Sequence, residues 1–403
     1  MKKLYFVIGF IAGVVTPFLS FSVVTAEETV SLLSLIEEAQ RNNPELEALH
    51  LDQEGAKEEI IQAPFLDDPQ LTLTQRGLGI EQAFPYPGKR SLKREIATLD
   101  WEMAQQEYQA KQLEISAEIK SAYYNLSFIY KTIDLHQEHQ GLLTQFIKIA
   151  EKKYAIGQST QQDLLKTEVE LAKLHNGRMT LEQDILATKA KINALINQSD
   201  SYPIGRPEDI TYRPFPFLYA KLIEEAVSLQ HGLRRALFRV EKNEAMKNLT
   251  KKAKLPDFML GVTYVNLQQA ESEWMLMGKM NLPWVFWEKY SAKNRKAVLD
   301  EDMAKASYNA LKNETLAQIK IIFTKIKTDE QLIDSYQNRL IPLAKQSLEV
   351  AQIGYQSGKT DFLNFIDSER TLLDLQIEYY MTLTDYWQQV AMLSPLIGKE
   401  INP

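Results

Sequence analysis

Cysteine is missing from this 403-residue chain. Its absence excludes a disulfide scaffold, a thiol catalyst and a lipid anchor attached through cysteine, so the fold must be held together by packing alone. Proline and glycine are also scarce, with 15 and 16 residues. Because they are clustered, the rest of the chain can form long helices that break at a few defined places.

Basic residues are in the minority: 46 Lys and Arg stand against 53 Asp and Glu, which gives a net charge of −7. A chain with this balance is a poor nucleic-acid binder, because nothing neutralises phosphates in bulk. Long hydrophobic runs are missing beyond the first 26 residues, so we predict no membrane-spanning helix there. If such a chain crosses a bilayer, it must do so as a closed β-barrel.

The first 26 residues have the pattern of a secretory signal peptide. Lys2 and Lys3 form a basic start, residues 4–24 are mostly apolar, and small residues end at Ala26. This order predicts cleavage after Ala26 and export from the cytoplasm. The alternative is a retained membrane anchor, because the apolar stretch is close to the length of a span.

An internal repeat organises the rest of the chain. Tyr154-Ala-Ile-Gly157 in the middle returns as Tyr355-Gln-Ser-Gly358 near the end, and residues 117–120 resemble residues 317–320. The repeat predicts two copies of one structural pattern. The first copy covers residues 27–200, a proline-rich connector covers 201–216, and the second copy covers 217–403.

Each copy has the same predicted order: a helix, a strand hairpin, a very long helix, a glycine turn and a long helix. Apolar side chains recur every three or four residues, as at Ile119, Tyr123 and Leu126, which is the pattern of a coiled-coil helix. A helix from Lys89 to Tyr154 is about 100 Å long. The helix after the short glycine turn must run back antiparallel to it.

A period of two residues predicts short strands in both copies. Residues 258–264 and 274–282 alternate between apolar and more polar side chains, and Leu71 and Leu73 do the same in the first copy, where residues 77–79 are predicted to turn the chain back. Such alternation is typical of a hairpin in a barrel wall. Since about eight strands are the minimum for a closed barrel, several chains must share one.

Large aromatic side chains flank the second hairpin. Trp274 lies in its second strand, and Trp284, Phe286 and Trp287 follow where that strand ends. Aromatic residues gather at membrane–water interfaces, so these four are candidates for a membrane-interface belt.

Together these features resemble the TolC-type outer-membrane efflux family. The resemblance covers nearly the whole chain after the signal peptide, and it is most specific at residues 154–165 and 355–367, which look like helix–turn–helix tips. It implies a mainly α fold with a small β part: long antiparallel coiled-coil helices that form an α-barrel, and four β-strands per chain that contribute to a shared trimeric β-barrel. It also implies a homotrimer in outer-membrane lipid with a large periplasmic part.

The function that the resemblance implies is that of a passive exit duct, without cofactor or catalysis. Substrates would be delivered by an inner-membrane pump and a periplasmic adaptor protein. Residues 82–89 are similar to the strand-to-helix junction of the branch paired with heavy-metal RND pumps. This similarity favours metal ions as substrates, and dyes, drugs or a polypeptide are also compatible with a duct.

The resemblance assigns roles to the tips as well. Family members often have aspartate six and nine residues after the tip glycine, where this chain has Asn364 and Asp367, with Asp361 close by. In a trimer, three copies of Asp367 around the symmetry axis would form a negatively charged periplasmic gate. The alternative is that Asp367 is a solvated charge favoured by a helix N-terminus. The candidate adaptor-contacting residues are Tyr154, Gly157, Tyr355 and Gly358, of which the glycines also end helices with positive φ.

Other functions have weaker support in the sequence. His136 and His139 are spaced for one helix face, but no third ligand is visible, so residues 134–140 are predicted to be a polar face and not a metal site. No phosphate-binding loop or catalytic constellation is present, which disfavours an enzyme. The alternative to a channel is a secreted coiled-coil structural or interaction protein of the periplasm whose apparent strands are loops.

Overall fold

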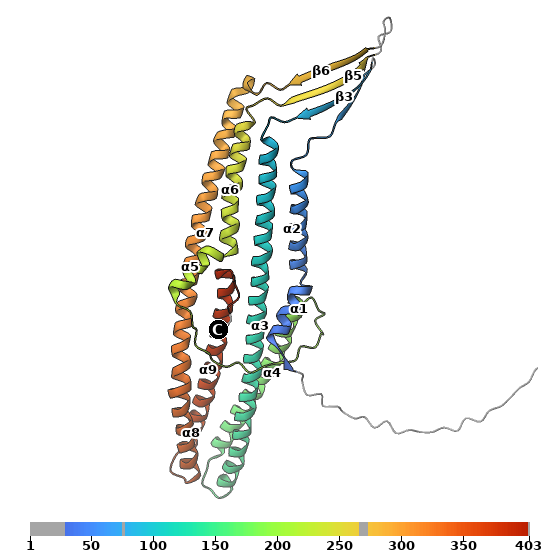
Figure 1. The fold of residues 1–403 in the computed structure, drawn as a ribbon. Coiled ribbons are helices and arrows are strands. Elements are labelled where there is room, and N and C mark those ends of the chain that lie inside the picture. The colour runs from blue at the N-terminus through green and yellow to red at the C-terminus, as the bar shows by residue number, and fades with distance from the viewer. Residues whose placement is uncertain (1–28, 75–76, 266–272, 402–403) are drawn as a thin grey trace, which may run out of the picture.

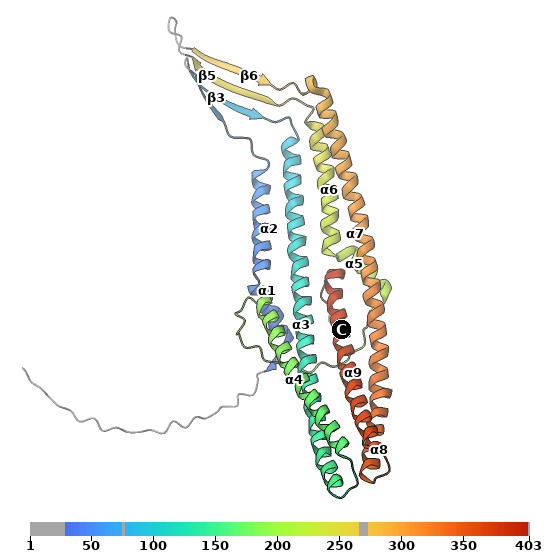
Figure 2. The ribbon, with the colours of Figure 1, turned by 180° about the vertical axis from the view of Figure 1, so that it is seen from behind.

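The computed structural model describes residues 29–74, 77–265 and 273–401, so the predicted signal peptide lies outside the described residues. The chain forms a rod of long helices with a small sheet at one end (Figure 1). Seen from behind, the turns that follow α3 and α8 both lie at the opposite end of the rod (Figure 2).

The first copy begins with two helices where the repeat predicts one. Helix α1 (Leu32–Asn42) stops at Asn43, whose side chain caps helix α2 (Pro44–Gln62) by accepting a hydrogen bond from the Glu45 amide at 2.9 Å. Proline at the first helical position suits this start, because its missing N–H needs no partner there. The copy continues with β2 (Gln70–Thr74), β3 (Gly77–Phe84), α3 (Lys89–Ala155) and α4 (Gln161–Leu195).

The second copy follows the same plan, with one irregular turn. Its elements are α5 (Tyr219–Leu229), α6 (His231–Lys252), β5 (Phe258–Val265), β6 (Glu273–Met280), the 3₁₀ turn η1 (Pro283–Phe286), α7 (Trp287–Ser335), the π-turn η2 (Tyr336–Leu340), α8 (Ile341–Gln356) and α9 (Phe362–Ile397). The π-turn lies next to Pro342, whose ring would clash with the carbonyl four residues earlier in a regular helix. A wider turn at this point relieves that clash.

The long helices have the predicted length and direction. Helix α3 has 67 residues, close to the predicted range, and α4 packs along it in the reverse direction. Between the copies, the connector crosses the middle of the rod. Its short strand β4 (Arg206–Pro207) pairs in parallel with β1 (Thr29–Val30), which ties the start of the described chain to the connector.

The two predicted hairpins join into one antiparallel sheet, in the order β2-β3-β5-β6. The predicted turn at residues 77–79 is wrong, because Gly77 is the first residue of β3 and pairs with both Thr74 and Val265. A Cβ atom on Gly77 would lie 2.1 Å from the Tyr264 carbonyl oxygen. Glycine is needed here to let β5 approach closely, and this close approach explains the glycine that the sequence pattern assigned to a turn.

The apolar core is divided into three clusters along the rod. One surrounds Tyr386 below the connector, one surrounds Leu126 between α1, α3 and α4, and one surrounds Phe146 at the tips. Such serial packing suits a rod that has no single centre. In the described part of the chain, no helix has the length and hydropathy needed to cross a membrane.

Candidate functional site

One face of the sheet is apolar and exposed across all four strands. The pairing places Leu73 beside Leu78, Leu78 beside Tyr264, and Tyr264 beside Trp274. Each of these side chains is at least 38% exposed. The face continues along the strands with the exposed side chains of Leu71, Ile80, Phe84, Phe258, Leu260, Val262, Leu276 and Met280. A continuous apolar surface of this kind indicates contact with another protein or with lipid.

The opposite face of the sheet is more polar. Lys279 of β6 donates to both carboxylate oxygens of Glu81 on β3 at 2.8 Å, across the intervening strand β5. A Cβ atom on Gly261 of β5 would lie 2.9 Å from the Glu81 side chain, so glycine leaves room for this ion pair. A sheet that is apolar on one face and polar on the other has the side-chain pattern of a barrel wall between lipid and water.

The four candidate interface aromatics lie at the two ends of this wall. Trp274 lies at the end of β6 that is remote from the helices, whereas Trp284, Phe286 and Trp287 lie where the chain enters α7. All four side chains are between 52% and 74% exposed. β6 has eight residues, so the two groups are separated by about 26 Å measured along the strand.

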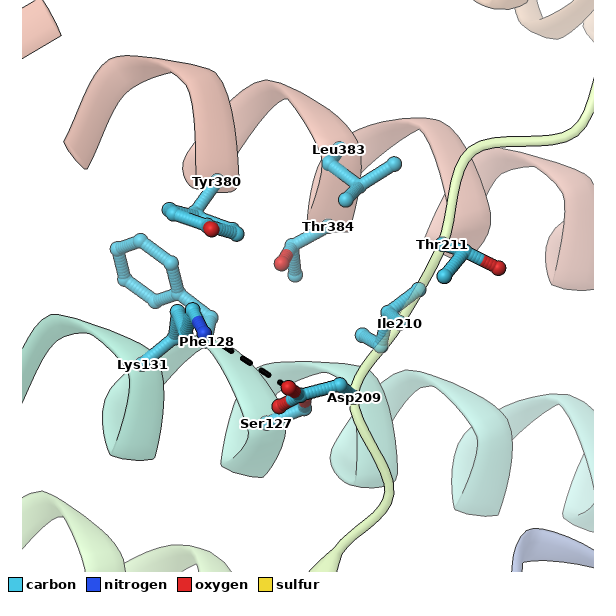
Figure 3. A pocket seen from close by; sticks show the side chains of 9 residues that line it. All are labelled: Ser127, Phe128, Lys131, Asp209, Ile210, Thr211, Tyr380, Leu383 and Thr384. Carbon is cyan, nitrogen blue, oxygen red and sulfur yellow. Dashed lines mark ion pairs between the residues drawn. The ribbon is translucent and has the colours of Figure 1, made fainter. Parts of the chain in front are cut away.

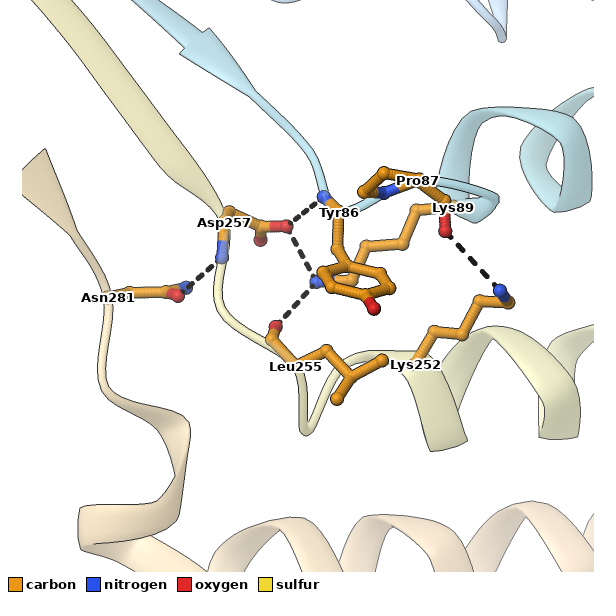
Figure 4. Close-up of polar contacts among 7 residues, drawn as sticks. All are labelled: Tyr86, Pro87, Lys89, Lys252, Leu255, Asp257 and Asn281. Atoms are coloured by element: carbon orange, nitrogen blue, oxygen red, sulfur yellow. Dashed lines mark hydrogen bonds and ion pairs between the residues drawn. The ribbon is translucent and has the colours of Figure 1, made fainter.

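A buried lysine fixes the sheet to the helices (Figure 4). Lys89 at the start of α3 forms an ion pair with Asp257 at 2.7 Å and donates to the Leu255 carbonyl at 3.2 Å. The same Asp257 accepts from the Tyr86 amide at 2.7 Å, and its own amide donates to the Asn281 side chain. These contacts join the first residues of α3, the link between α6 and β5, and the end of β6, so they hold the sheet at one angle to the rod.

The two tips at the other end of the rod end their helices as predicted. Gly157 and Gly358 have φ angles of 73° and 74°, a conformation that glycine adopts without strain. After the first turn, Thr160 and Asp163 form a capping box that starts α4. After the second turn, Asp361 occupies the N-cap of α9, but its side chain makes no capping hydrogen bond.

The tips are packed against each other by aromatic rings. Phe146 of α3 stacks on Phe365 of α9, with ring centroids 3.7 Å apart. Lys153 donates to the Tyr355 carbonyl and lies over the Tyr355 ring at 4.5 Å. The two repeat-related tyrosines therefore differ: Tyr154 is 47% exposed, whereas Tyr355 is 5% exposed. The Tyr355 ring therefore lies in the core of the tip.

The three candidate gate residues are exposed at the start of α9. Asn364 and Asp367 lie on the side opposite to the buried Phe362 and Phe365. At 3.6 residues per turn, three exposed carboxylates farther along α9 lie within about 80° of Asn364 and Asp367 around the helix axis. These carboxylates are Asp374, Glu378 and Asp385. Helix α9 has a single basic residue, Arg370, which forms an ion pair with Glu170 at 2.6 Å, so this face is acidic over much of its length.

His139 was predicted to lie on a polar face, and this prediction is wrong. Its side chain is 3% exposed, and its two ring nitrogens face the Glu369 carboxylate at 2.6 Å and the Gln376 side-chain oxygen at 2.9 Å. Burial alone would lower the pKa of His139, but the hydrogen bonds with these two residues and the nearby carboxylates raise it. Sequence patterns missed this contact because Glu369 and Gln376 each lie more than 200 residues from His139 in the chain.

His136 does not join His139 in a site. Its ring packs against α4, where a Cβ atom on Gly177 would lie 2.8 Å from it, and burial lowers the pKa of His136. Among the described residues, no group of three or more His, Asp or Glu side chains is arranged to hold a metal ion. The acidic face of α9 is therefore a surface of separated charges.

A small cavity lies beneath the connector in the middle of the rod (Figure 3). It has a volume of 230 Å³ and is bordered by α3, α9 and the connector. Lys131 and Asp209 form an ion pair at 3.7 Å beside it, and Lys131 lies 5.4 Å from the Tyr380 ring. The volume is below the range of about 300–1,000 Å³ that ligand sites occupy, so the cavity is a packing gap under the connector.

The two-faced sheet, the coiled-coil rods and the helix–turn–helix tips together define a channel-type outer-membrane protein. Residues 35–198 and 222–399 match the outer membrane efflux protein family, and the chain belongs to that family. It is therefore an efflux channel protein of the outer membrane with a large periplasmic part. The alternative of a secreted coiled-coil rod is not supported, because the apparent strands are paired strands of one sheet.

Similar proteins agree with this assignment. The cobalt-zinc-cadmium resistance protein CzcC of Cupriavidus metallidurans is 20% identical over 380 residues, which cover 90% of this chain and 88% of the relative. The solved structure of VceC from Vibrio cholerae has a TM-score of 0.78 at 20% identity, with 91% and 96% of the two chains covered. For CusC the TM-score is 0.80 at 13% identity, with 92% of each chain covered. The predicted mainly α fold with a small β part is confirmed by these structures.

Proposed function

We propose that three copies of this chain close into one duct, which carries cations out of the cell as the exit channel of a tripartite efflux system. The main support is the sheet. Its outer strands, β2 and β6, each have an unpaired edge within the described chain, and unpaired edges cannot be exposed to lipid. All neighbouring strands of the sheet are antiparallel, so β2 and β6 run in opposite directions. The β6 edge of one chain can therefore pair with the β2 edge of the next chain, and three sheets of four strands can close into a twelve-stranded barrel.

The acidic face of α9 supports cations as the substrate class. If α9 lines the duct, three copies of Asp367, Asp374 and Asp385 surround the axis, and rings of carboxylates raise the local concentration of cations. The metal resistance named for CzcC makes divalent metal ions the first substrates to test. An inner-membrane pump and a periplasmic adaptor would supply the energy and the connection, with Tyr154, Gly157 and Gly358 at the exposed tips as candidate contacts.

Crosslinking tests the closed barrel. Because the sequence has no cysteine, only the introduced cysteines can react. Cysteines placed at Thr72 on β2 and Met275 on β6 project from edge strands of the polar face. With a short bis-maleimide, we expect a ladder that ends at the trimer, whereas the Thr72→Cys variant alone should give no ladder. A ladder that stops at dimers, or none at all, contradicts the shared barrel.

Single-channel recording in planar bilayers tests the substrate class. Asp367→Asn should lower the cation-to-anion permeability ratio, and Asn364→Asp should raise it. Glu168→Gln, which removes an exposed carboxylate from α4, is the matched control and should leave the ratio unchanged. Equal ratios in all variants would show that α9 does not line the narrow part of the duct.

A further inference from the structure

Positive charge gathers where the helices meet the sheet, although the chain as a whole is acidic. The segments 89–96, 251–257 and 288–296 contain eleven Lys and Arg and three acidic residues. The antiparallel register of β3, β5 and β6 aligns their helix-side ends at Phe84, Phe258 and Met280. This alignment brings the start of α3, the end of α6 and the start of α7 together at the sheet end of the rod (Figure 1).

Several of these cations have no carboxylate partner. We define the basic collar as Lys93, Arg94, Lys251, Lys254, Lys289 and Lys293. None of the six forms an ion pair within the part of the chain that the structure describes. Two of the three acids in these segments are already engaged, Asp257 with Lys89 and Glu288 with Arg295. No short ion pair neutralises the collar, although Lys93 lines a groove together with Glu59, Asp67 and Asp68.

Aromatic rings connect the collar to the apolar face of the sheet. The Lys254 ammonium lies 4.8 Å from the Trp287 ring, and the Lys289 and Lys293 ammonium groups each lie 5.8 Å from the Tyr290 ring. Trp287 follows the exposed Phe286 at the end of the sheet. From the sheet to the first turns of the helices, the surface therefore changes from apolar strands to aromatic rings and then to cations, which is the order of chemistry found from the acyl chains of a leaflet to its headgroups.

From this arrangement we infer that the basic collar binds the headgroups of anionic phospholipids in the periplasmic leaflet of the outer membrane. The inference rests on the proposed position of the sheet in the membrane. A second copy of the chain is a poorer occupant for most of the collar. Helices α3 and α6 lie between α2 and α7 of the same chain, so a neighbouring copy reaches α2 or α7 first.

Helix α2 provides the contrast that makes the collar specific. Its sheet-proximal end carries Glu54, Glu58 and Glu59 with one lysine, Lys57, and the link to β2 adds Asp67 and Asp68. Anionic headgroups are therefore attracted to the α3, α6 and α7 side of each chain and repelled at α2. In a trimer this would give three separate lipid sites and not a continuous ring.

The test uses a variant of the full chain with Lys93→Gln, Lys251→Gln and Lys254→Gln. The matched control, Lys148→Gln with Lys152→Gln and Lys166→Gln, removes the same charge near the tips, where Lys148 and Lys152 are exposed and Lys166 is half-buried. Binding of brominated phosphatidylglycerol and of brominated phosphatidylcholine to the detergent-solubilised protein is followed by quenching of tryptophan fluorescence. Each lysine near an anionic surface strengthens binding about fivefold, so the variant should lose up to about 100-fold in its preference for phosphatidylglycerol.

Parent and control proteins should keep that preference, and 0.5 M NaCl should weaken it in both, because salt screens exposed charges. An unchanged preference in the triple variant overturns the inference. If the collar instead pairs with a second copy, the variant will lose its oligomer in lipid-free detergent, and this outcome also overturns it. Conductance in pure phosphatidylcholine bilayers separates the failure of the duct from the failure of the lipid site. A protein that conducts there but does not prefer phosphatidylglycerol is a duct without a lipid site.

Discussion

The buried pair of His139 and Glu369 offers a direct test of how α3 is held to α9. We consider two replacements, His139→Leu and Glu369→Leu, and their combination. In the first, the Glu369 carboxylate stays buried without its partner, and removing one partner of a buried pair costs about 3–5 kcal/mol. In the second, His139 can remain neutral, so the cost is that of unpaired polar groups, about 1–3 kcal/mol.

The double variant distinguishes this reasoning from simple loss of packing. Replacing both members of a buried pair with apolar groups is often neutral or stabilising, because the desolvation cost disappears with the charges. For a chain of this length, 1 kcal/mol shifts the melting temperature by about 1 °C. We therefore expect His139→Leu to melt about 3–5 °C below the parent, and the double variant to melt close to the parent.

Thermal melting in detergent, followed by circular dichroism at 222 nm, measures these differences. The raised pKa of His139 adds a pH signature. Its stabilisation is complete below the unfolded value of about 6.5 and is lost as the pH rises through the higher folded value. The parent should therefore gain on the double variant as the pH falls from 8 to 6. Apart from Glu369, which the double variant also lacks, the titratable groups are common to both proteins. Additive losses in the double variant, or a difference that does not change with pH, would refute the reasoning.

Two further predictions concern other parts of the rod. Phe146→Ala removes a fully buried ring that stacks on Phe365, so it should cost about 3–5 kcal/mol and speed protease cleavage at the tips, with the exposed Phe65→Ala as control. Burial and the neighbouring Asp385 raise the pKa of Asp329 to about 6, so the native state disfavours the ionised carboxylate. Asp329→Asn should then raise the melting temperature at pH 8 and have no effect at pH 4; a loss at pH 8 would contradict this sign.

The long helices, their tips and the strands could be predicted because each follows from a local pattern. Apolar spacing of three and four residues holds along α3 without a break, and a glycine at the tip is enough to end it. The alternation of residues 258–264 likewise needs no distant information. Local patterns do not show how strands from the two halves of the repeat pair with each other. The pairing of β3 with β5 joins residues that are about 180 positions apart in the chain.

The misses share one physical cause, which is packing between elements far apart in the chain. His139 has a polar side chain on a helix, and nothing local shows that Glu369 and Gln376 lie opposite it. Tyr154 and Tyr355 occupy equivalent positions in the repeat, yet only Tyr355 has Phe362 against its ring. Gly77 was assigned to a turn because glycine is common there, and the close approach of the Tyr264 carbonyl could not be read from sequence.

The π-turn at Tyr336–Leu340 bears on how the two copies came to differ in length. Matched residues are 200 positions apart at Tyr108 and Tyr308, but 201 apart at Tyr154 and Tyr355. The second copy is thus one residue longer within the interval that contains the π-turn, and such a turn holds one residue more than an α-turn. Because the extra residue is confined to one wide turn, the apolar stripe returns to the same side afterwards, and Ile333 before the turn and Ala344 after it are both buried. A coiled-coil rod can therefore accept one extra residue and keep its apolar stripe on one side, provided that a single wide turn accommodates that residue.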